Sequence, residues 1–103
     1  MNSAVEILKA ARELISDPAH WTQGSEARDE KGDPVLARSK GARCFCAVGA
    51  LISASGKAPW KRPLEALRSE LPKPIFYVSD FNDTGSHEEV LALFDRAIER
   101  AAS

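Results

Sequence analysis

The sequence predicts a mainly α-helical domain in which about four helices pack round a buried central helix near residues 46–55, with a small β-hairpin near residues 25–36. Sixteen alanines stand against twelve valines, isoleucines and threonines together, a composition that favours helix over sheet. Two stretches repeat apolar residues at helical spacing, each behind a Ser-x-x-Glu pattern that is typical of a helix start. A third stretch is apolar on every side, as expected of a helix that is buried all round.

The first helix begins behind Ser3, because its hydroxyl oxygen and the carboxylate of Glu6 can each accept from a free amide at a helix start. Its apolar stripe consists of Ile7, Leu8, Ala11, Leu14 and Ile15, and its end is marked by Pro18. Residues 18–43 then predict irregular structure apart from the hairpin. In the hairpin, Asp29 can start the turn and Gly32 can take the positive φ of a bulged turn.

The central helix is predicted by the apolar segment that starts at Cys44 and continues to Ile52, since no charged residue stands between Arg43 and Lys57. Gly56 suits its C-terminal cap. A third helix follows, with Pro63 in its first turn and Pro72 beyond its end. Its buried face consists of Leu64, Ala66, Leu67 and Leu71.

Residues 75–78 are aromatic and β-branched, which predicts either a strand or an extended segment. The turn-forming residues 81–85 follow and lead into the last helix. That helix begins with a second capping box, formed by Ser86 and Glu89. Its apolar stripe consists of Val90, Leu91, Phe94, Ala97, Ile98 and Ala101.

The length of 103 residues fits a single domain over residues 1–103. No apolar run approaches the ~20 residues of a transmembrane helix, and the N-terminus lacks the apolar stretch of a signal peptide. We therefore expect a cytoplasmic protein that does not enter a membrane. The six glycines form no phosphate-binding motif, so no cofactor is expected.

Cys44 and Cys46 stand one residue apart, too close for an ordinary disulfide. As metal ligands they would need both His20 and His87, in a spacing that matches no known knuckle, so we expect no metal site. A thiol at the start of the buried helix could instead be a nucleophile, with a lowered pKa. Its base would be His87 or His20, oriented by Asp80, Asn82 or Asp83. The alternative is that both thiols are small core residues.

Several polar and aromatic loop residues belong to no amphipathic pattern, and they are the candidates for a ligand site: Trp21, Gln23, Arg28, Asn82 and Asp83. We hypothesise that their loops converge on the amino end of the central helix, with Arg28 as the charged contact to an anionic group. In the competing interpretation, Arg28 pairs with Asp83 or Asp29 and only ties the hairpin to the helices.

Charge is unevenly distributed along the chain. Residues 38–73 carry eight bases and two acids, whereas the segments before and after them have net charges of −3 and −4. This basic segment could be an anion-binding or nucleic-acid surface, or the acidic flanks could fold against it and cancel it. The pI near 6.1 disfavours nucleic acid, because nucleic-acid-binding domains are usually basic overall.

An ordered set of motifs extends over nearly the whole chain: Trp-Thr-Gln-Gly at 21–24, Ala-Arg-Asp at 27–29 with Gly32 and Val35, Cys-Phe-Cys-Ala-Val-Gly-Ala-Leu at 44–51, Asn-Asp at 82–83, and residues 89–98. In this set the chain resembles a family of small bacterial and phage proteins catalogued as a domain of unknown function. Phe45 and Phe81 stand where that family often has Trp. The resemblance implies one domain and transfers no activity and no catalytic residue.

These observations predict a non-enzymatic interaction or ligand-binding module, whose partner is another protein, a second copy of the chain or a small ligand. The first alternative is a cysteine-dependent hydrolase-like enzyme that uses Cys46 or Cys44. The second is a nucleic-acid-associated protein that uses the basic segment 38–73. A pocket with a thiol near a histidine would indicate the enzyme, and salt-sensitive binding the nucleic-acid protein.

Overall fold

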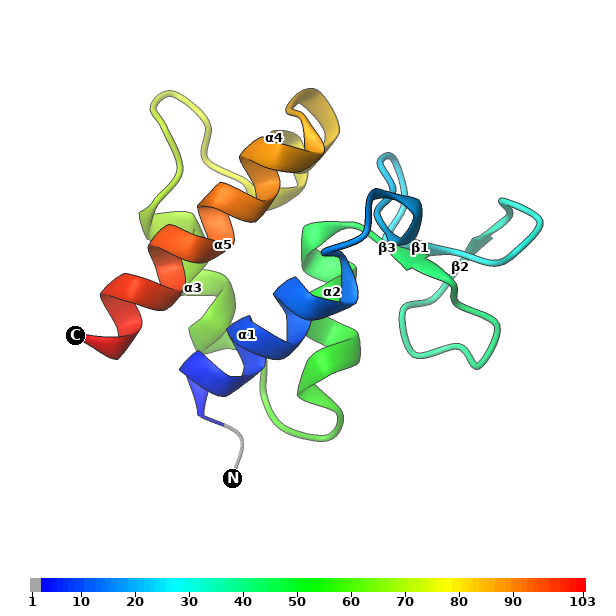
Figure 1. Cartoon of the computed structure of the whole chain (residues 1–103), viewed down its shortest axis with the longest axis horizontal. Helices are drawn as coiled ribbons and strands as arrows, with labels where there is room; N and C mark the ends of the chain where they lie inside the picture. The colour runs from blue at the N-terminus through cyan, green and yellow to red at the C-terminus, as the bar shows by residue number, and fades with distance from the viewer. Residues whose placement is uncertain (1–2) are drawn as a thin grey trace.

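The helices gather toward one end of the molecule and the short strands toward the other, as a computed structural model of residues 3–103 shows (Figure 1). The elements in chain order are α1 (Ala4–Leu14), a 3₁₀ helix η1 (Pro18–His20), β1 (Ala27–Arg28), β2 (Pro34–Val35), β3 (Cys44–Phe45), α2 (Ala47–Ser55), α3 (Lys61–Ser69), α4 (Val78–Thr84) and α5 (His87–Ala102). The fold is thus mainly α with a small antiparallel sheet, and it has one helix more than the sequence predicts.

Both predicted capping boxes are present. At α1, the Ser3 hydroxyl accepts from the Glu6 amide at 3.2 Å, and the Glu6 carboxylate accepts from the Ser3 amide at 3.1 Å. At α5, Ser86 and Glu89 exchange the same two bonds at 3.1 and 2.8 Å. The predicted first turns are confirmed, because each box satisfies donors that the helix itself cannot.

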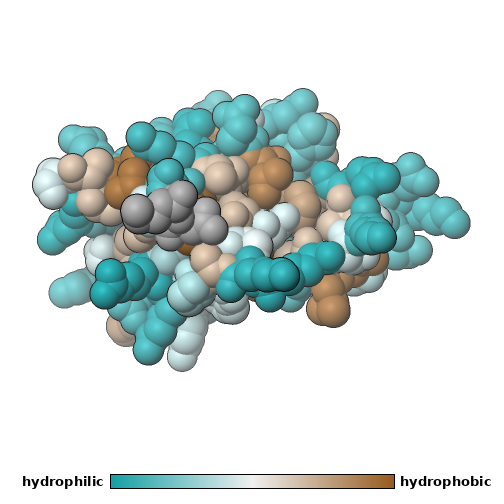
Figure 2. Space-filling model, turned by 90° about the horizontal axis from the view of Figure 1, so that it is seen from below, coloured by the Kyte–Doolittle hydropathy of each residue, from teal (hydrophilic) through white to brown (hydrophobic). Residues whose placement is uncertain are grey.

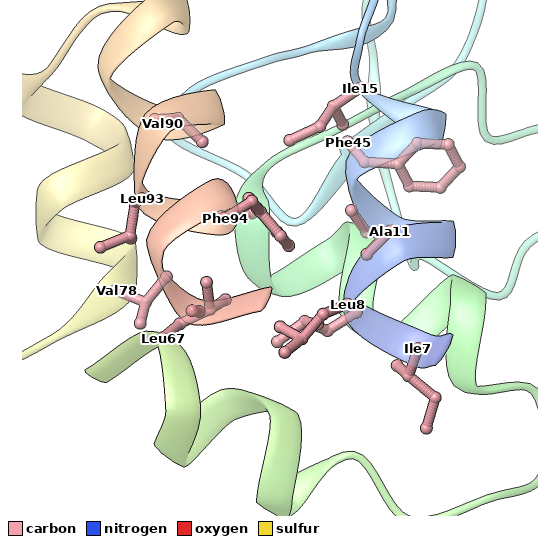
Figure 3. Close-up of a cluster of buried hydrophobic side chains, with 14 of the residues drawn as sticks. Ile7, Leu8, Ala11, Ile15, Phe45, Leu67, Val78, Val90, Leu93 and Phe94 are labelled. Atoms are coloured by element: carbon pink, nitrogen blue, oxygen red, sulfur yellow. The ribbon is translucent and has the colours of Figure 1, made fainter. Parts of the chain in front are cut away.

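The hydrophobic core lies around α1, which packs on both α2 and α5. Figure 3 shows Val90 and Phe94 of α5 on the side of that helix toward α1, where Leu8 and Ile15 lie; all four side chains are buried. The sequence predicts that the first and last helices pack around residues 46–54; α1 does pack on α2, while α5 packs chiefly on α1 and α3. Backbone closely approaches another side of α2, since a Cβ atom on Gly49 would lie 1.9 Å from the carbonyl oxygen of Glu26. The backbone before β1 therefore covers one side of α2.

The predicted hairpin is present and carries a third strand. β1 pairs antiparallel with β2 and with β3, so Ala27 faces Val35 on one side and Phe45 on the other. Gly32 takes a φ of 86°, as predicted for the turn. Residues 44–45 pair as a strand rather than opening the central helix, which starts at Ala47 behind the N-cap Cys46.

Helix α4, like β3, is an element that the sequence pattern does not predict. Residues 75–77 have no regular structure, so the strand alternative is wrong for them, and Val78 begins a helix. Residues 81–84 are helical rather than a turn. Val78, Phe81 and Asn82 form one buried face at a spacing of three and four residues, and a buried asparagine in that face hides the apolar pattern.

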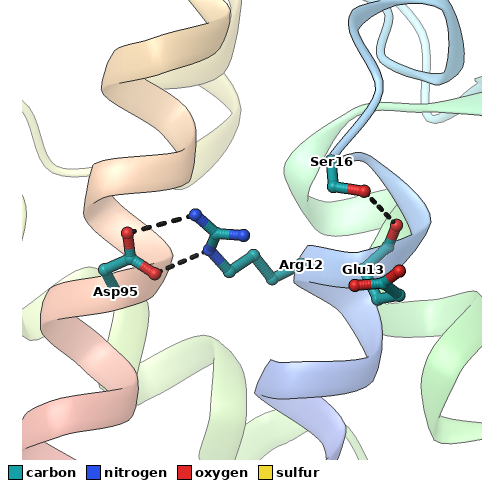
Figure 4. A network of polar contacts seen from close by, with 4 residues as sticks. All are labelled: Arg12, Glu13, Ser16 and Asp95. Atoms are coloured by element: carbon teal, nitrogen blue, oxygen red, sulfur yellow. Dashed lines mark hydrogen bonds and ion pairs between the residues drawn. The ribbon is translucent and has the colours of Figure 1, made fainter.

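Two ion pairs join helices among residues 3–103. Arg12 of α1 pairs with both carboxylate oxygens of Asp95 of α5, at 2.6 and 3.2 Å (Figure 4). Arg100 of α5 lies 3.5 Å from Glu70, just beyond α3. Within the same residues, no helix combines the length and the apolar character that crossing a bilayer requires.

Candidate functional site

Asn82 is a fully buried polar side chain that joins α4, α2 and the loop after η1. Its Oδ1 accepts from the indole Nε1 of Trp21 at 2.7 Å and from the amide of Ala47 at 2.9 Å. Its Nδ2 donates to the carbonyl of Thr22 at 3.0 Å and to the carboxylate of Asp83 at 3.1 Å. The side chain uses its full hydrogen-bonding capacity and fixes this loop at the first turn of α2.

Arg28 lies on β1 and reaches the same loop. Its Nε donates to the hydroxyl of Thr22 at 3.0 Å, and its terminal nitrogens donate to the carbonyls of Gly32 and Gln23 at 3.0 and 3.2 Å. Arg28 and Asn82 therefore share Thr22 as a partner, and the predicted convergence of their loops is observed. The competing pairing of Arg28 with Asp83 or Asp29 is not observed within residues 3–103.

Gln23 and Asp83 complete the network from opposite sides. The amide of Gln23 donates to the carbonyls of Asn82 and Gly85, both at 3.0 Å, and Asp83 accepts from the backbone amide of Gly24 at 2.9 Å. The structure thus brings all five predicted ligand residues together. Their hydrogen bonds are directed to one another and to the backbone, an arrangement typical of a structural tie. Ligand binding by these residues stays a prediction.

Within residues 3–103, the hydrogen bonds of the two cysteine thiols are made with backbone groups and not with His87. Cys46 is buried, and its Sγ accepts from the amide of Gly49 at 3.3 Å as the N-cap of α2. Burial raises the pKa of the Cys46 thiol, the opposite of the change that activates a nucleophile. The half-buried Cys44 thiol lies 3.9 Å from the carbonyl of Arg28.

His87 is half-buried, and its ring makes a hydrogen bond with the end of α1. Its Nε2 lies 2.6 Å from the carbonyl oxygen of Ile15, so Nε2 carries the proton and donates. The imidazole ring lies 5.4 Å from the ring of Trp21. Residues 3–103 hold no group of three His, Cys, Asp or Glu side chains placed to bind a metal ion. His87 thus serves as a contact between α5 and α1.

An open cavity of about 630 Å³ lies between the loop of residues 36–43 and the carboxyl-terminal part of α2. We call it the basic hollow, and it is lined by Ala37, Arg38, Ser39, Ala42, Phe45, Ser53, Gly56 and Lys57. Arg38 donates to the carbonyl of Gly56 at 2.7 Å, which holds its guanidinium at the edge of the hollow. The side chains that line it include two cations and no acid.

The loop of the hollow is tied to the rest of the fold. The amide of Ala37 donates to the carboxylate of Glu26 at 2.6 Å, and the amide of Arg43 donates to the carbonyl of Arg28 on β1 at 2.8 Å. Seen from below, the sheet end of the molecule is covered mostly by hydrophilic side chains, whereas hydrophobic ones gather toward the middle (Figure 2). The basic hollow at this end is therefore lined in part by a loop, residues 36–43, that hydrogen bonds hold to the rest of the fold.

The acidic flanks do not neutralise the basic segment through ion pairs. The two ion pairs within residues 3–103 use Arg12 and Arg100, which lie outside residues 38–73. Arg38 and Lys57 thus face the hollow without a carboxylate partner. The sequence indicated the excess of bases, but it did not indicate which of them share a cavity, because they are separated by 19 positions.

Comparison with curated proteins and with solved structures gave no match. A scan against family models gave one, described as "Family of unknown function (DUF6197)", which covers residues 1–100. This match supports the part of the resemblance that concerns a family of unknown function extending over nearly the whole chain. The chain belongs to the family of unknown function DUF6197.

Proposed function

We propose that this protein is a non-enzymatic binding module that holds a carboxylate-bearing partner in the basic hollow. One observation carries the proposal: Arg38 and Lys57, from distant segments, line one open cavity whose lining includes no acidic side chain. A cavity of about 630 Å³ falls in the range of roughly 300–1,000 Å³ that is typical of ligand sites.

The lining defines the chemistry of the ligand. The guanidinium of Arg38 has donors left after its bond to Gly56, and Lys57 adds an ammonium group. The hydroxyls of Ser39 and Ser53 can donate to further oxygens, while Phe45 supplies an apolar wall. This set suits two or more carboxylates next to a small apolar group, as in a polycarboxylate or an acidic protein segment.

The alternatives lack comparable support. The raised pKa of the buried Cys46 thiol opposes a nucleophilic enzyme. The protein as a whole has a net charge of −1, which opposes a nucleic-acid surface built on residues 38–73.

The test is a titration of the ¹⁵N-labelled protein with citrate and, separately, with a hexaglutamate peptide. We expect shifts of the amide signals of Ser39, Ser53 and Gly56, and binding that weakens with added salt. The variant with Arg38→Gln and Lys57→Gln should bind at least about tenfold more weakly, since it loses both charge-assisted contacts. The matched control is Arg62→Gln, which removes an exposed base of the same segment outside the hollow.

Binding by citrate alone would identify a small polycarboxylate as the ligand, and binding by the peptide alone would identify an acidic protein segment. Equal weakening in the Arg62→Gln control would show a diffuse charge effect and would contradict the proposal. Tight binding of an oligonucleotide with no response to either probe would move the protein to the nucleic-acid class.

A further inference from the structure

Two adjacent aromatic side chains stand exposed on the segment between α3 and α4. Phe76 is 70% exposed and Tyr77 is 63% exposed, and Leu36 is the other large hydrophobic residue of 3–103 exposed to this degree. Tyrosine and other aromatic residues are enriched in the centres of protein interfaces, together with arginine. An exposed aromatic pair is therefore a candidate contact for a partner.

The backbone is fixed on both sides of the aromatic pair, by Ile75 before it and by the start of α4 after it. Ile75 packs against the core, and its amide donates to the carbonyl of Pro72 at 2.9 Å. Tyr77 is the N-cap of α4, and its carbonyl accepts the first helical bond, from the amide of Phe81 at 3.2 Å. The rings are thus presented on a fixed backbone, which lowers the entropy lost on binding.

An open cavity of about 400 Å³ adjoins Phe76. Its apolar lining includes Leu71 and Ile75, and its charged lining includes Arg68, Lys73 and Glu65. Neither base takes part in the two ion pairs found within residues 3–103. The lining of the cavity therefore combines apolar side chains with two bases and one acid, which leaves a net charge of +1.

We propose that Phe76, Tyr77 and this cavity form a second docking surface, for a segment of another protein in which apolar side chains are flanked by acidic ones. The charges select this occupant, because the apolar side chain would fill the cavity while its acidic neighbours meet Arg68 and Lys73. A second copy of this chain fits less well. Its other exposed hydrophobic residue, Leu36, is two positions from the base Arg38 in the sequence and would bring like charges together.

This surface is separate from the basic hollow and goes beyond the function proposed above. The segment with Phe76 and Tyr77 and the loop of residues 36–43 lie toward opposite ends of the molecule, beyond α3 and beyond β2 respectively (Figure 1). The longest extent of the molecule is 39 Å. One partner could therefore occupy each end at the same time.

The test uses three fluorescein-labelled probes with the full chain: the peptide Glu-Asp-Leu-Leu-Asp-Glu, its relative Glu-Asp-Ser-Ser-Asp-Glu, and a twelve-nucleotide oligothymidine. We expect the leucine peptide to bind most tightly. The variant with Phe76→Ala and Tyr77→Ala should weaken it at least about tenfold, as truncation of interface anchors does. Leu36→Ala is the matched control, since it removes an equally exposed apolar side chain from the other end.

Arg68→Gln with Lys73→Gln should weaken the leucine peptide and lower the salt dependence of its binding. Arg38→Gln with Lys57→Gln should weaken the leucine and serine peptides alike, because either acidic peptide can also enter the basic hollow, and should leave the ratio of their affinities unchanged. The preference for leucine and the binding of citrate in the hollow can therefore fail independently. Circular dichroism should show that all of these surface variants stay folded. Equal affinity for both peptides, an equal effect of Leu36→Ala, preferred binding of oligothymidine, or self-association abolished by Phe76→Ala would each overturn the proposal.

Discussion

Asn82 shows how one polar side chain can organise several segments. It accepts two hydrogen bonds and donates two, and it is fully buried. The sequence indicated that Asn82 and Trp21 belong to one cluster, because neither fits an amphipathic stripe. It did not indicate that the polar groups of the cluster form hydrogen bonds within it. Two of the partners are backbone groups of Thr22 and Ala47, and a pattern of residue types does not show which backbone groups a side chain will bind.

Asn82→Ala should lower the free energy of unfolding by about 2–4 kcal/mol, because it leaves the indole of Trp21 and the amide of Ala47 buried without an acceptor. Urea denaturation measures the change. Asp80→Ala, two residues earlier on the exposed side of α4, is the control and should change stability by less than about 0.5 kcal/mol. A similar loss of unfolding free energy in both variants would show that α4 is destabilised by truncation of any side chain. The specific role assigned to Asn82 would then be wrong.

Cys46 gives the protein a pH dependence in the alkaline range. Burial raises the pKa of its thiol above the ordinary value of 9.0, so the unfolded chain releases this proton more readily than the folded one. Stability is therefore fully present below pH 9 and decreases as pH rises through the higher folded-state pKa. Thermal melting from pH 7.5 to 10.5 should show this decrease, and Cys46→Ala should reduce it relative to Cys44→Ala. Rapid labelling of Cys46 by a thiol reagent in the native state would contradict this assignment.

At the level of the elements, a helix or strand could be predicted when the signals for it lie within its own sequence. Helices α1 and α5 each have a capping box and an apolar stripe within their own sequence, and both were predicted. β3 and α4 have no such signals: Cys44 and Phe45 pair with β1, 16 or more positions away, and α4 takes its register from a buried asparagine. The two cations of the basic hollow are equally non-local, which is why the sequence revealed a basic segment and not a cavity.

Gly49 is the point at which α2 and the sheet depend on each other. An added Cβ would lie 1.9 Å from the carbonyl oxygen of Glu26, so Gly49→Ala forces the backbone before β1 away from α2. We expect a loss of at least about 2 kcal/mol of unfolding free energy, despite the better helix propensity of alanine. Gly41→Ala is the control, because its Cβ would meet only ordinary contacts at 3.7 Å and beyond. Chemical denaturation of the two variants compares them directly, and a stable Gly49→Ala variant would contradict the close approach.

At the scale of the whole molecule, the two proposed surfaces should act independently. They lie toward opposite ends of a body 39 Å long, and the Debye length is only about 8 Å at 0.15 M salt. Contacts that share no partner are additive. At a concentration of the leucine peptide that fills its own surface and leaves the hollow free, the affinity of the hollow for citrate should therefore change by no more than about 0.3–0.5 kcal/mol. Isothermal titration in both orders measures this.

At 10 mM salt the Debye length grows to about 30 Å, and each of the two acidic ligands should then slightly weaken the binding of the other. Strong coupling at 0.15 M salt would instead mean that both probes compete for one surface, which would rule out two separate sites.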